Sequence, residues 1–257
     1  MERNPAVAGS FYSGDPEELR AMIADCLNRA KPEIPKGKLR GIIVPHAGYV
    51  YSGPVAAYGY KLLQGAQPKS LERIVILGPS HYAAFPGMVE SGYSSWGTPL
   101  GETETFSINV PAYPPAHEPE HSLEVQLPFL QQVLEGKAFS ICPILTGEIL
   151  PKEGATALEA KAKDSFFVVS SDLSHYLPYN TAVTRDRLSI SLIEALDVDG
   201  FVKNGDACGK TGIAIIMALA KKKGWRIVKL HYANSGDTAG PKDGVVGYAA
   251  LAVVEGK

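Results

Sequence analysis

The sequence predicts a single α/β domain, spanning residues 1–257, in which a largely parallel or mixed central sheet is flanked by helices. Apolar strand-like runs alternate with helix-like runs almost throughout, a pattern typical of parallel strands covered on both faces. No internal repeat or low-complexity linker divides the chain. A chain of this length buries about three quarters of the surface that unfolding exposes, so one substantial core is expected.

The expected elements of the first half begin with a helix over residues 15–29. Asp15 suits the N-cap, Pro16 the first helical position and Glu18 the first turn. An apolar run over 41–45 predicts a strand, and Ser52 and Pro54 indicate the start of a helix that returns across the sheet. A second strand over 74–80 leads into a long loop, which we expect to form a wall or lid that ends near residue 119.

The second half continues the alternation. A helix is expected to begin near residue 120, because Leu123, Leu127 and Leu130 have the spacing of one helical face, and its first turn would carry His121. The remaining predictions are strands over 139–145 and 166–170, helices over 180–196 and 209–223, and strands over 226–232 and 245–254.

Three of the expected strands run directly into histidines. His46 follows the first, His81 follows the second, and Asp172 and His175 follow the strand over 166–170. Because the carboxyl ends of parallel strands share one edge of a sheet, where open α/β folds place ligand and metal sites, these side chains are expected to meet. A lone histidine after a strand is more often structural, so the prediction depends on the coincidence of three.

Cys208 stands immediately before a strongly apolar helix. Unpaired N–H groups at a helix N-terminus and the positive charge of Lys210 would both favour its thiolate, which makes it a metal ligand or nucleophile. The opposing interpretation, a small buried apolar residue, is equally open for Cys208 and is preferred for Cys26 and Cys142.

Two histidines and a thiolate form a three-point ligand set for Zn(II), copper or Fe(II). Asp172 and His175, three residues apart, indicate acid/base machinery or an imidazole oriented by a carboxylate, or merely a capping aspartate with a loop histidine. His121 is assigned to the same pocket. His121 and Glu124 also match a metal-binding His-x-x-Glu pattern, although that pattern is common by chance.

Composition and motifs exclude several other functions. Lys and Arg total 25 against 27 Asp and Glu, so the net charge of −2 offers no basic surface for a nucleic acid. There is no Gly-x-Ser-x-Gly elbow, and the glycine spacing of Gly205–Thr211 does not match a P-loop. The longest apolar stretch, 212–220, is too short for a membrane helix, and unpaired cysteines are typical of a cytoplasmic protein, which we expect this to be.

Six ordered motifs together resemble the Memo family, whose prokaryotic members are called AmmeMemoRadiSam system protein B. They are Ala8-Gly-Ser-Phe-Tyr12, Pro45-His-Ala-Gly-Tyr49, Leu77-Gly-Pro-Ser-His81, Glu120-His-Ser-Leu-Glu124, Val169-Ser-Ser-Asp-Leu-Ser-His175 and Cys208-Gly209. The resemblance implies the fold of class III extradiol dioxygenases, which hold non-haem iron with two histidines and a carboxylate, here replaced by cysteine. It implies His46, His81 and Cys208 as metal ligands and His121, Asp172 and His175 as catalytic pocket residues.

The resemblance also implies a radical S-adenosylmethionine protein of the same gene set as a partner. One departure is that family members continue from the cysteine with Gly-Arg and a proline, whereas Lys210 stands here, and lysine cannot reproduce the bidentate contacts of arginine. Three functions stay open: a redox enzyme with Fe(II) or copper, a zinc-type metallohydrolase at the same site, and a non-catalytic protein that binds a peptide or partner in an enzyme-like pocket.

Overall fold

The protein is described by a computed structural model that covers residues 1–64 and 69–256. Its centre is a seven-stranded mixed sheet with the order β4 (Met88–Glu90), β7 (Ser140–Thr146), β3 (Arg73–Pro79), β8 (Phe166–Ser170), β2 (Lys38–Val44), β10 (Gly247–Glu255) and β9 (Arg226–Asn234). A separate three-stranded sheet has the order β1 (Glu2–Arg3), β5 (Ser95–Thr98) and β6 (Gly101–Glu104).

The four central strands of the large sheet are parallel, with β7 beside β3, β3 beside β8 and β8 beside β2. The strands β4, β10 and β9 add antiparallel pairs at the two edges. This confirms the predicted fold class, a largely parallel mixed sheet in an α/β domain. It also places the carboxyl ends of β2, β8 and β3 next to one another.

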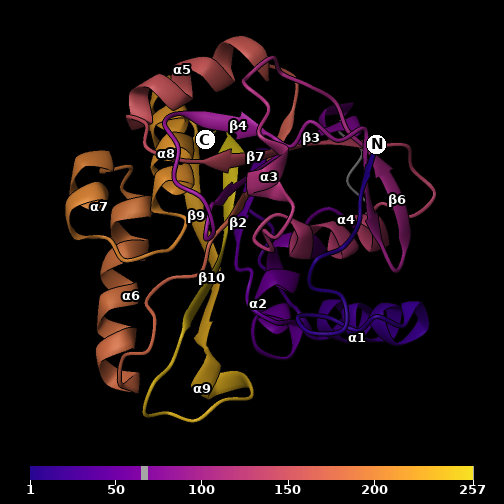
Figure 1. The fold of residues 1–257 in the computed structure, drawn as a ribbon. Helices are drawn as coiled ribbons and strands as arrows, with labels where there is room; N and C mark the ends of the chain where they lie inside the picture. The colour runs from indigo at the N-terminus through magenta and orange to yellow at the C-terminus, as the bar shows by residue number, and fades with distance from the viewer. Residues whose placement is uncertain (65–68, 257) are drawn as a thin grey trace.

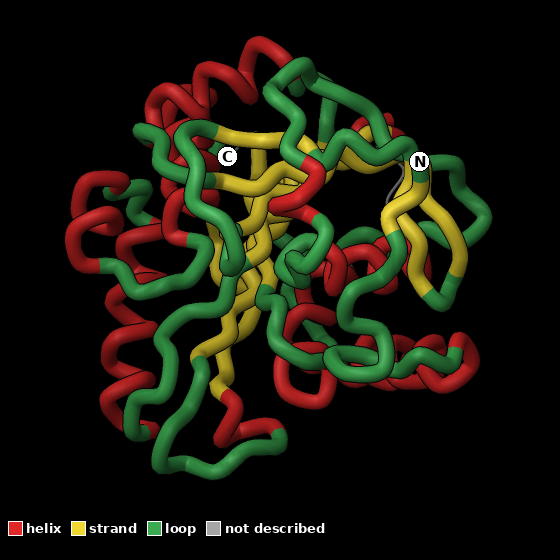
Figure 2. Tube along the Cα trace, viewed as in Figure 1, coloured by secondary structure: helices red, strands yellow, loops and turns green. Residues whose placement is uncertain are grey.

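Helices cover both faces of the sheet (Figures 1 and 2). One face packs on α1 (Pro16–Arg29), α2 (Tyr49–Lys61), α3 (Pro114–His117) and α4 (Leu127–Val133); the other packs on α5 (Pro151–Lys161), α6 (Tyr179–Glu194), α7 (Val198–Asn204) and α8 (Lys210–Lys223). Side chains alternate between the two cores along each central strand: Ile76 faces the first and Leu77 the second. Both faces are apolar, as strands buried on two sides require.

The first two helices begin where capping allows. The Asp15 side chain accepts hydrogen bonds from the backbone N–H groups of Glu17 and Glu18, as the sequence predicts for α1. The helix α2 starts three residues before the expected Ser52, because the Tyr49 N–H donates to the Phe11 carbonyl oxygen at 2.8 Å. Pro54 therefore lies inside the helix.

The long segment after His81 contains more regular structure than the expected loop. It includes β4, β5, β6 and α3, and ends in the 3-10 turn η2 (Glu124–Gln126), which leads directly into α4. The helix expected from residue 120 thus begins at Leu127, with Pro128 in its first turn, where a missing N–H costs nothing. His121 precedes η2 rather than standing in a helical turn. A short 3-10 turn, η1 (Lys69–Glu72), precedes β3, and α9 (Ser235–Thr238) follows β9.

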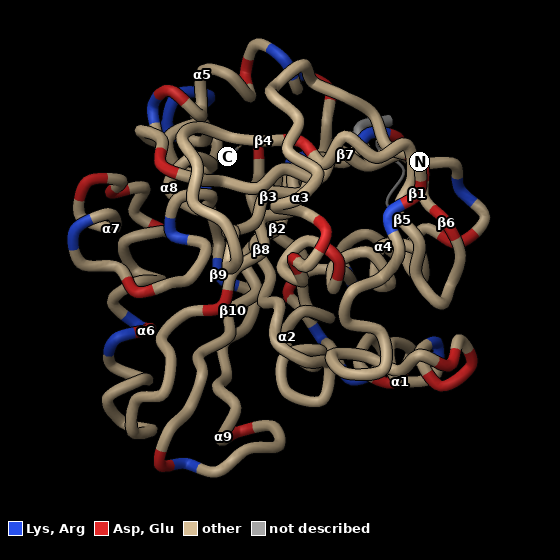
Figure 3. Tube along the Cα trace, viewed as in Figure 1, with Lys and Arg blue, Asp and Glu red and all other residues tan. Residues whose placement is uncertain are grey.

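Charged residues of both signs are interspersed along the outer helices and loops (Figure 3). Within residues 1–64 and 69–256, no helix combines the length and the apolar character needed to cross a membrane.

Candidate metal centre

The structure brings His46, His81 and Cys208 together at the carboxyl edge of the parallel strands. One ring nitrogen of each histidine and the Cys208 Sγ all lie within 4.8 Å of one another. The His46 Nε2 is 3.1 Å from the sulfur, although 162 positions separate the two residues in sequence. The convergence follows from topology, because His46 and His81 leave β2 and β3 on either side of β8, and Cys208 stands at the start of α8.

Backbone contacts to the turn after β8 hold Cys208 in place. Its N–H donates to the Asp172 carbonyl oxygen at 3.2 Å, and the Asp172 N–H donates to the Cys208 Sγ, also at 3.2 Å. The next residue has to be glycine, since a Cβ at Gly209 would stand 2.7 Å from the Ser170 carbonyl oxygen. The Cys208-Gly209 pair therefore fits the close approach of α8 to the end of β8.

His46 is held from both its backbone and its ring. Its N–H donates to the Asp172 Oδ1 at 2.8 Å, and its ring Nδ1 lies 2.9 Å from the Ser170 hydroxyl. The residue is 2% exposed. Burial, followed by the charges of His121 and His81, lowers the pKa of His46 well below its ordinary value, so the ring stays neutral and its Nε2 is open to a ligand.

His81 is held by Glu120, a residue that the sequence did not single out as functional. The Glu120 side chain is completely buried, and its Oε1 accepts from the His81 Nδ1 at 2.9 Å while its Oε2 accepts from the His81 N–H at 2.6 Å. Burial acts to raise the pKa of Glu120, but hydrogen bonds from His81 and from the Ser122 N–H outweigh it and hold the pKa at about 2. Glu120 is thus an ionised carboxylate that orients a histidine, an arrangement typical of metal sites.

His121 lies in the same pocket. Its ring stacks on that of His81 with centroids 4.6 Å apart, and its centroid is 5.5 Å from that of His46. The His121 Nδ1 is buried, has no hydrogen-bond partner among the described residues, and stands 3.5 Å from the Glu120 Oε1. Burial lowers the pKa of His121, which favours a neutral ring beside those of His46 and His81.

Asp172 and His175 do not form the expected pair. In the part of the chain that the structure describes, no hydrogen bond joins their side chains; Asp172 is buried and holds the His46 backbone instead. His175 is exposed, and its charge lowers both the pKa of His46 and that of Asp172. Burial raises the pKa of Asp172 to about 6 despite these partners.

The expected stabilisation of the Cys208 thiolate by its helix is present but outweighed by burial: hydrogen bonds from the Asp172 N–H, from Ser171 and from the Gly209 N–H each act to lower the pKa of the thiol. Burial, and then the Asp172 charge, raise the pKa of the Cys208 thiol to about 12. The Lys210 Nζ lies 3.4 Å from the Val202 carbonyl oxygen at α7, so its charge is directed away from the sulfur. The sequence pattern showed the helix terminus but not the buried carboxylate beside it.

These side chains fit a metal ion on the chemistry of their donor set. Both Nδ1 atoms are occupied by buried hydrogen-bond partners, which leaves the two Nε2 atoms and one sulfur for an ion. The 3.1 Å between the His46 Nε2 and the Cys208 Sγ is within about 4.3 Å, the sum of typical metal–nitrogen and metal–sulfur bonds, so one ion could contact both. A thiol is deprotonated when a metal coordinates it, which removes the pKa obstacle.

Two other candidate ligand groups fit less well. His81, Glu120 and His121 also cluster, but both Glu120 oxygens already accept N–H donors. The His-x-x-Glu interpretation is wrong, because Glu124 is buried in an ion pair with Arg3 at 2.7 Å and accepts from the Tyr12 hydroxyl at 2.6 Å.

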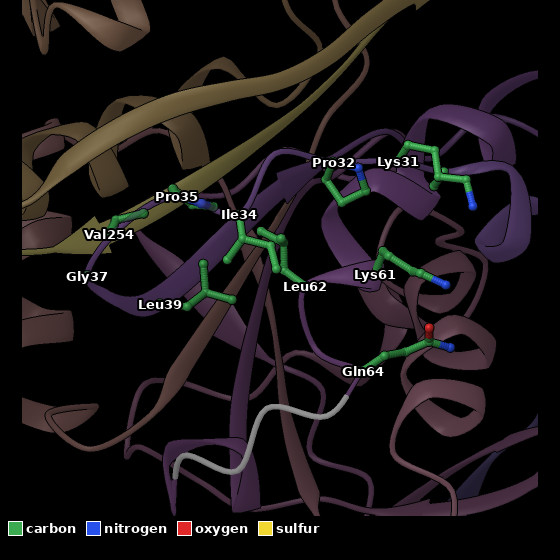
Figure 4. Close-up of a pocket in the computed structure, with 11 residues that line it drawn as sticks. Lys31, Pro32, Ile34, Pro35, Gly37, Leu39, Lys61, Leu62, Gln64 and Val254 are labelled. Atoms are coloured by element: carbon green, nitrogen blue, oxygen red, sulfur yellow. The ribbon is translucent and has the colours of Figure 1, made fainter.

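A cavity of about 490 Å³ adjoins Cys208 and is lined also by Phe85, Thr146, Glu148 and Thr211. A cavity of about 520 Å³ elsewhere has a different character: the apolar side chains of Ile34, Leu39 and Leu62 gather at its centre, with Lys31 and Lys61 at one end (Figure 4). None of its lining residues is a histidine, cysteine or carboxylate. Only the first of these two cavities contains a candidate metal ligand.

Comparisons with known proteins agree with the motifs. The family model described as "Memo-like protein" matches residues 3–252. A MEMO1 family protein of Methanopyrus kandleri is 38% identical, with 98% of each chain covered, and one of Sulfolobus acidocaldarius is 37% identical, covering 98% of this chain and 99% of that protein. A crystal structure of an uncharacterized protein from Escherichia coli K12 has a TM-score of 0.47 and 11% identity, covering 84% of this chain and 100% of that chain. From the family match and the identity to its relatives over nearly their whole length, this chain belongs to the Memo family.

Proposed function

We propose that this protein is a metal-dependent redox enzyme in which His46, His81 and Cys208 hold Fe(II) or a copper ion. The observation that carries the proposal is the convergence of two oriented imidazoles and one thiol from three separate parts of the chain. Nitrogen and sulfur donors of this kind suit iron, copper and zinc. The likeness of Memo proteins to class III extradiol dioxygenases supports a redox metal, which would supply one-electron chemistry and dioxygen binding.

The chain's own residues would divide the remaining tasks. Glu120 and Asp172 would fix the positions of His81 and His46 through the hydrogen bonds described above. His121, neutral and with an unused Nδ1, would accept or return a proton inside the pocket, while exposed His175 would exchange protons with solvent. The cavity beside Cys208 would admit a small molecule or a peptide side chain. We place this activity in the cytoplasm, which the three unpaired cysteines support.

Metal titration without oxygen tests the ligand set. Wild-type protein should bind one equivalent of Fe(II) or Cu(I), and His46→Ala, His81→Ala and Cys208→Ser should each lose stoichiometric binding. The matched controls are His231→Ala, which removes a histidine stacked on Tyr58 away from the site, and Cys26→Ala, which removes a buried thiol in α1. Both controls should retain one equivalent. Unchanged metal content in the three site variants would place the ion elsewhere.

The redox character needs a separate measurement. Exposure of the iron-loaded protein to air should produce a ferric electron paramagnetic resonance signal that ascorbate removes, and Cys208→Ser should abolish it. If the protein selects zinc over both redox metals and its activity is indifferent to oxygen, a metallohydrolase takes the place of this proposal. If a partner peptide binds the pocket equally well after chelation, the site serves recognition instead.

A further inference from the structure

The Ser170 hydroxyl is a buried junction behind the candidate metal centre. Ser170 is the last residue of β8 and is 0% exposed. Its Oγ lies 2.5 Å from the Ser122 carbonyl oxygen, 2.7 Å from the Gln126 Nε2 and 2.9 Å from the His46 Nδ1. Three polar partners therefore share one hydroxyl, which has a single proton to give.

The orientation of the Gln126 side-chain amide is fixed by its other partners. Its Nε2 lies 2.9 Å from the Pro45 carbonyl oxygen, which can only accept, so this atom is the NH₂ group. The amide oxygen accepts from the Tyr60 hydroxyl at 2.7 Å. The Gln126 NH₂ group thus donates a hydrogen bond to the Ser170 Oγ and occupies one of the two lone pairs of that oxygen.

The Ser170 proton is assigned in the same way. The Ser122 carbonyl oxygen can only accept a hydrogen bond, so the Ser170 hydroxyl must donate its hydrogen to that oxygen. The remaining lone pair of Oγ then faces the His46 Nδ1, and a contact of 2.9 Å is a hydrogen bond only if that nitrogen carries the proton. A neutral His46 protonated on Nδ1 has an unprotonated Nε2, the atom that faces the Cys208 Sγ.

We propose that Ser170 is a positioning residue that fixes His46 in the Nδ1–H tautomer and so presents its Nε2 as a ready metal ligand. The consequence for metal affinity rests on the proposed function of the site; the tautomer does not. The opposite tautomer would need the Ser170 proton at Nδ1, leaving the buried Ser122 carbonyl against an oxygen lone pair.

One short segment, residues 120–126, orients both candidate histidine ligands. The Ser122 N–H donates a hydrogen bond to the Glu120 Oε1, and Glu120 in turn orients His81. The Ser122 carbonyl oxygen accepts a hydrogen bond from the Ser170 hydroxyl, and Ser170 in turn orients His46. Gln126 also helps to orient His46, because its Nε2 donates a hydrogen bond to the Ser170 Oγ. His81 is thus oriented by a carboxylate and His46 by a neutral hydroxyl whose direction the segment 120–126 sets.

The experiment is nitrogen NMR of histidine-labelled protein prepared without metal, followed by Co(II) titration. In wild type, the His46 Nδ1 should be protonated and the Nε2 should show the shift of an unprotonated nitrogen. Ser170→Ala should release this preference and give a mixture or the opposite tautomer, and it should weaken Co(II) binding by about 10–100-fold, the usual effect of losing such a partner. The matched control is Ser174→Ala, since Ser174 is equally buried but its side chain interacts with Asp186 rather than with a candidate metal ligand.

The outcomes separate this inference from the proposed function. A wild-type His46 protonated on Nε2 would overturn the tautomer assignment without any variant, so the test survives even if Ser170→Ala fails to fold. A Ser170→Ala protein with the wild-type tautomer and wild-type Co(II) affinity would also overturn it. The inference would be supported if wild type shows the predicted tautomer and the preference is lost in Ser170→Ala but kept in Ser174→Ala. This holds even if none of these proteins binds metal, in which case only the proposed function fails.

Discussion

At the scale of single residues, two buried carboxylates with similar surroundings have different tasks. Glu120 accepts three N–H donors beside the candidate ligands, whereas Glu124 ties the N-terminal segment to the turn η2. Glu124 accepts from Arg3, from the N–H groups of Ala6 and Val7, and from Tyr12. Neither side chain is exposed, so each depends on its partners to offset the loss of water.

Glu124→Gln is expected to destabilise the protein strongly, because it leaves the 1%-exposed Arg3 without a full counter-charge. Breaking a buried ion pair from one side costs about 3–5 kcal/mol, which urea denaturation would measure. The control, Glu135→Gln, breaks an exposed pair with Arg20 and should change the free energy of unfolding by less than about 1 kcal/mol. Equal effects of the two substitutions would refute the account of Glu124.

At the scale of elements, the contact between α5 and α8 depends on a glycine. A Cβ at Gly154 in α5 would stand 2.6 Å from the Cδ1 and 2.7 Å from the Cγ1 of Ile215, which is buried in α8. Gly212 in α8 differs, since its nearest neighbours would be 3.6 Å or more from an added Cβ. The two glycines therefore provide a matched pair.

Gly154→Ala should lower the free energy of unfolding, and Gly212→Ala should leave it unchanged or raise it. Overpacking a fitted core costs about 1–3 kcal/mol, which exceeds the gain of about 1 kcal/mol that alanine has over glycine in a helix. Thermal and urea unfolding of both variants would measure the difference. A stabilised Gly154→Ala protein would show that Ile215 can move aside.

The same two helices share an ion cluster at the surface. Glu159 of α5 pairs with Lys222 and with Lys223 of α8, the latter at 2.6 Å. Hydrogen bonds from Lys222 and then Lys223 lower the pKa of Glu159 to about 2. A carboxylate whose pKa is lower in the folded state stabilises the protein above its unfolded pKa and loses this effect as the pH falls.

The difference in unfolding free energy between wild type and Glu159→Gln should therefore be largest near neutral pH. It should shrink as the pH falls from about 4.5 toward about 2, and it should also shrink with added salt. Denaturation of both proteins across this range measures it. If the difference in unfolding free energy between the two proteins does not change with pH, the ion pairs of Glu159 with Lys222 and Lys223 do not contribute to stability.

At the scale of the whole molecule, the strand order explains why the histidines and the cysteine that the sequence singles out lie close together. Histidines after two parallel strands must share an edge of the sheet, and the structure places His46 and His81 there with Cys208. The short strands β4, β5 and β6 are not predictable from the sequence pattern, because each has only 3 or 4 residues in a stretch rich in glycine and proline. Local pattern carries little information about such strands.

The roles of Glu120 and Ser170 could not be predicted, since each depends on a partner far along the chain. Glu120 meets a histidine 39 positions away and Ser170 one 124 positions away. The one available signal was the position of Glu120 beside His121 within a motif. The direction of the Cys208 pKa was wrong for a related reason: a helix terminus is visible in sequence, whereas burial against Asp172 is not.

The most direct test of the metal site is anomalous diffraction from crystals of protein loaded with Fe(II) or Cu(I) in the absence of oxygen. The account predicts a single strong peak within bonding distance of the His46 Nε2, a ring nitrogen of His81 and the Cys208 Sγ. A peak beside Glu120 and His121 without the sulfur, or no peak in protein shown to be folded, would contradict it.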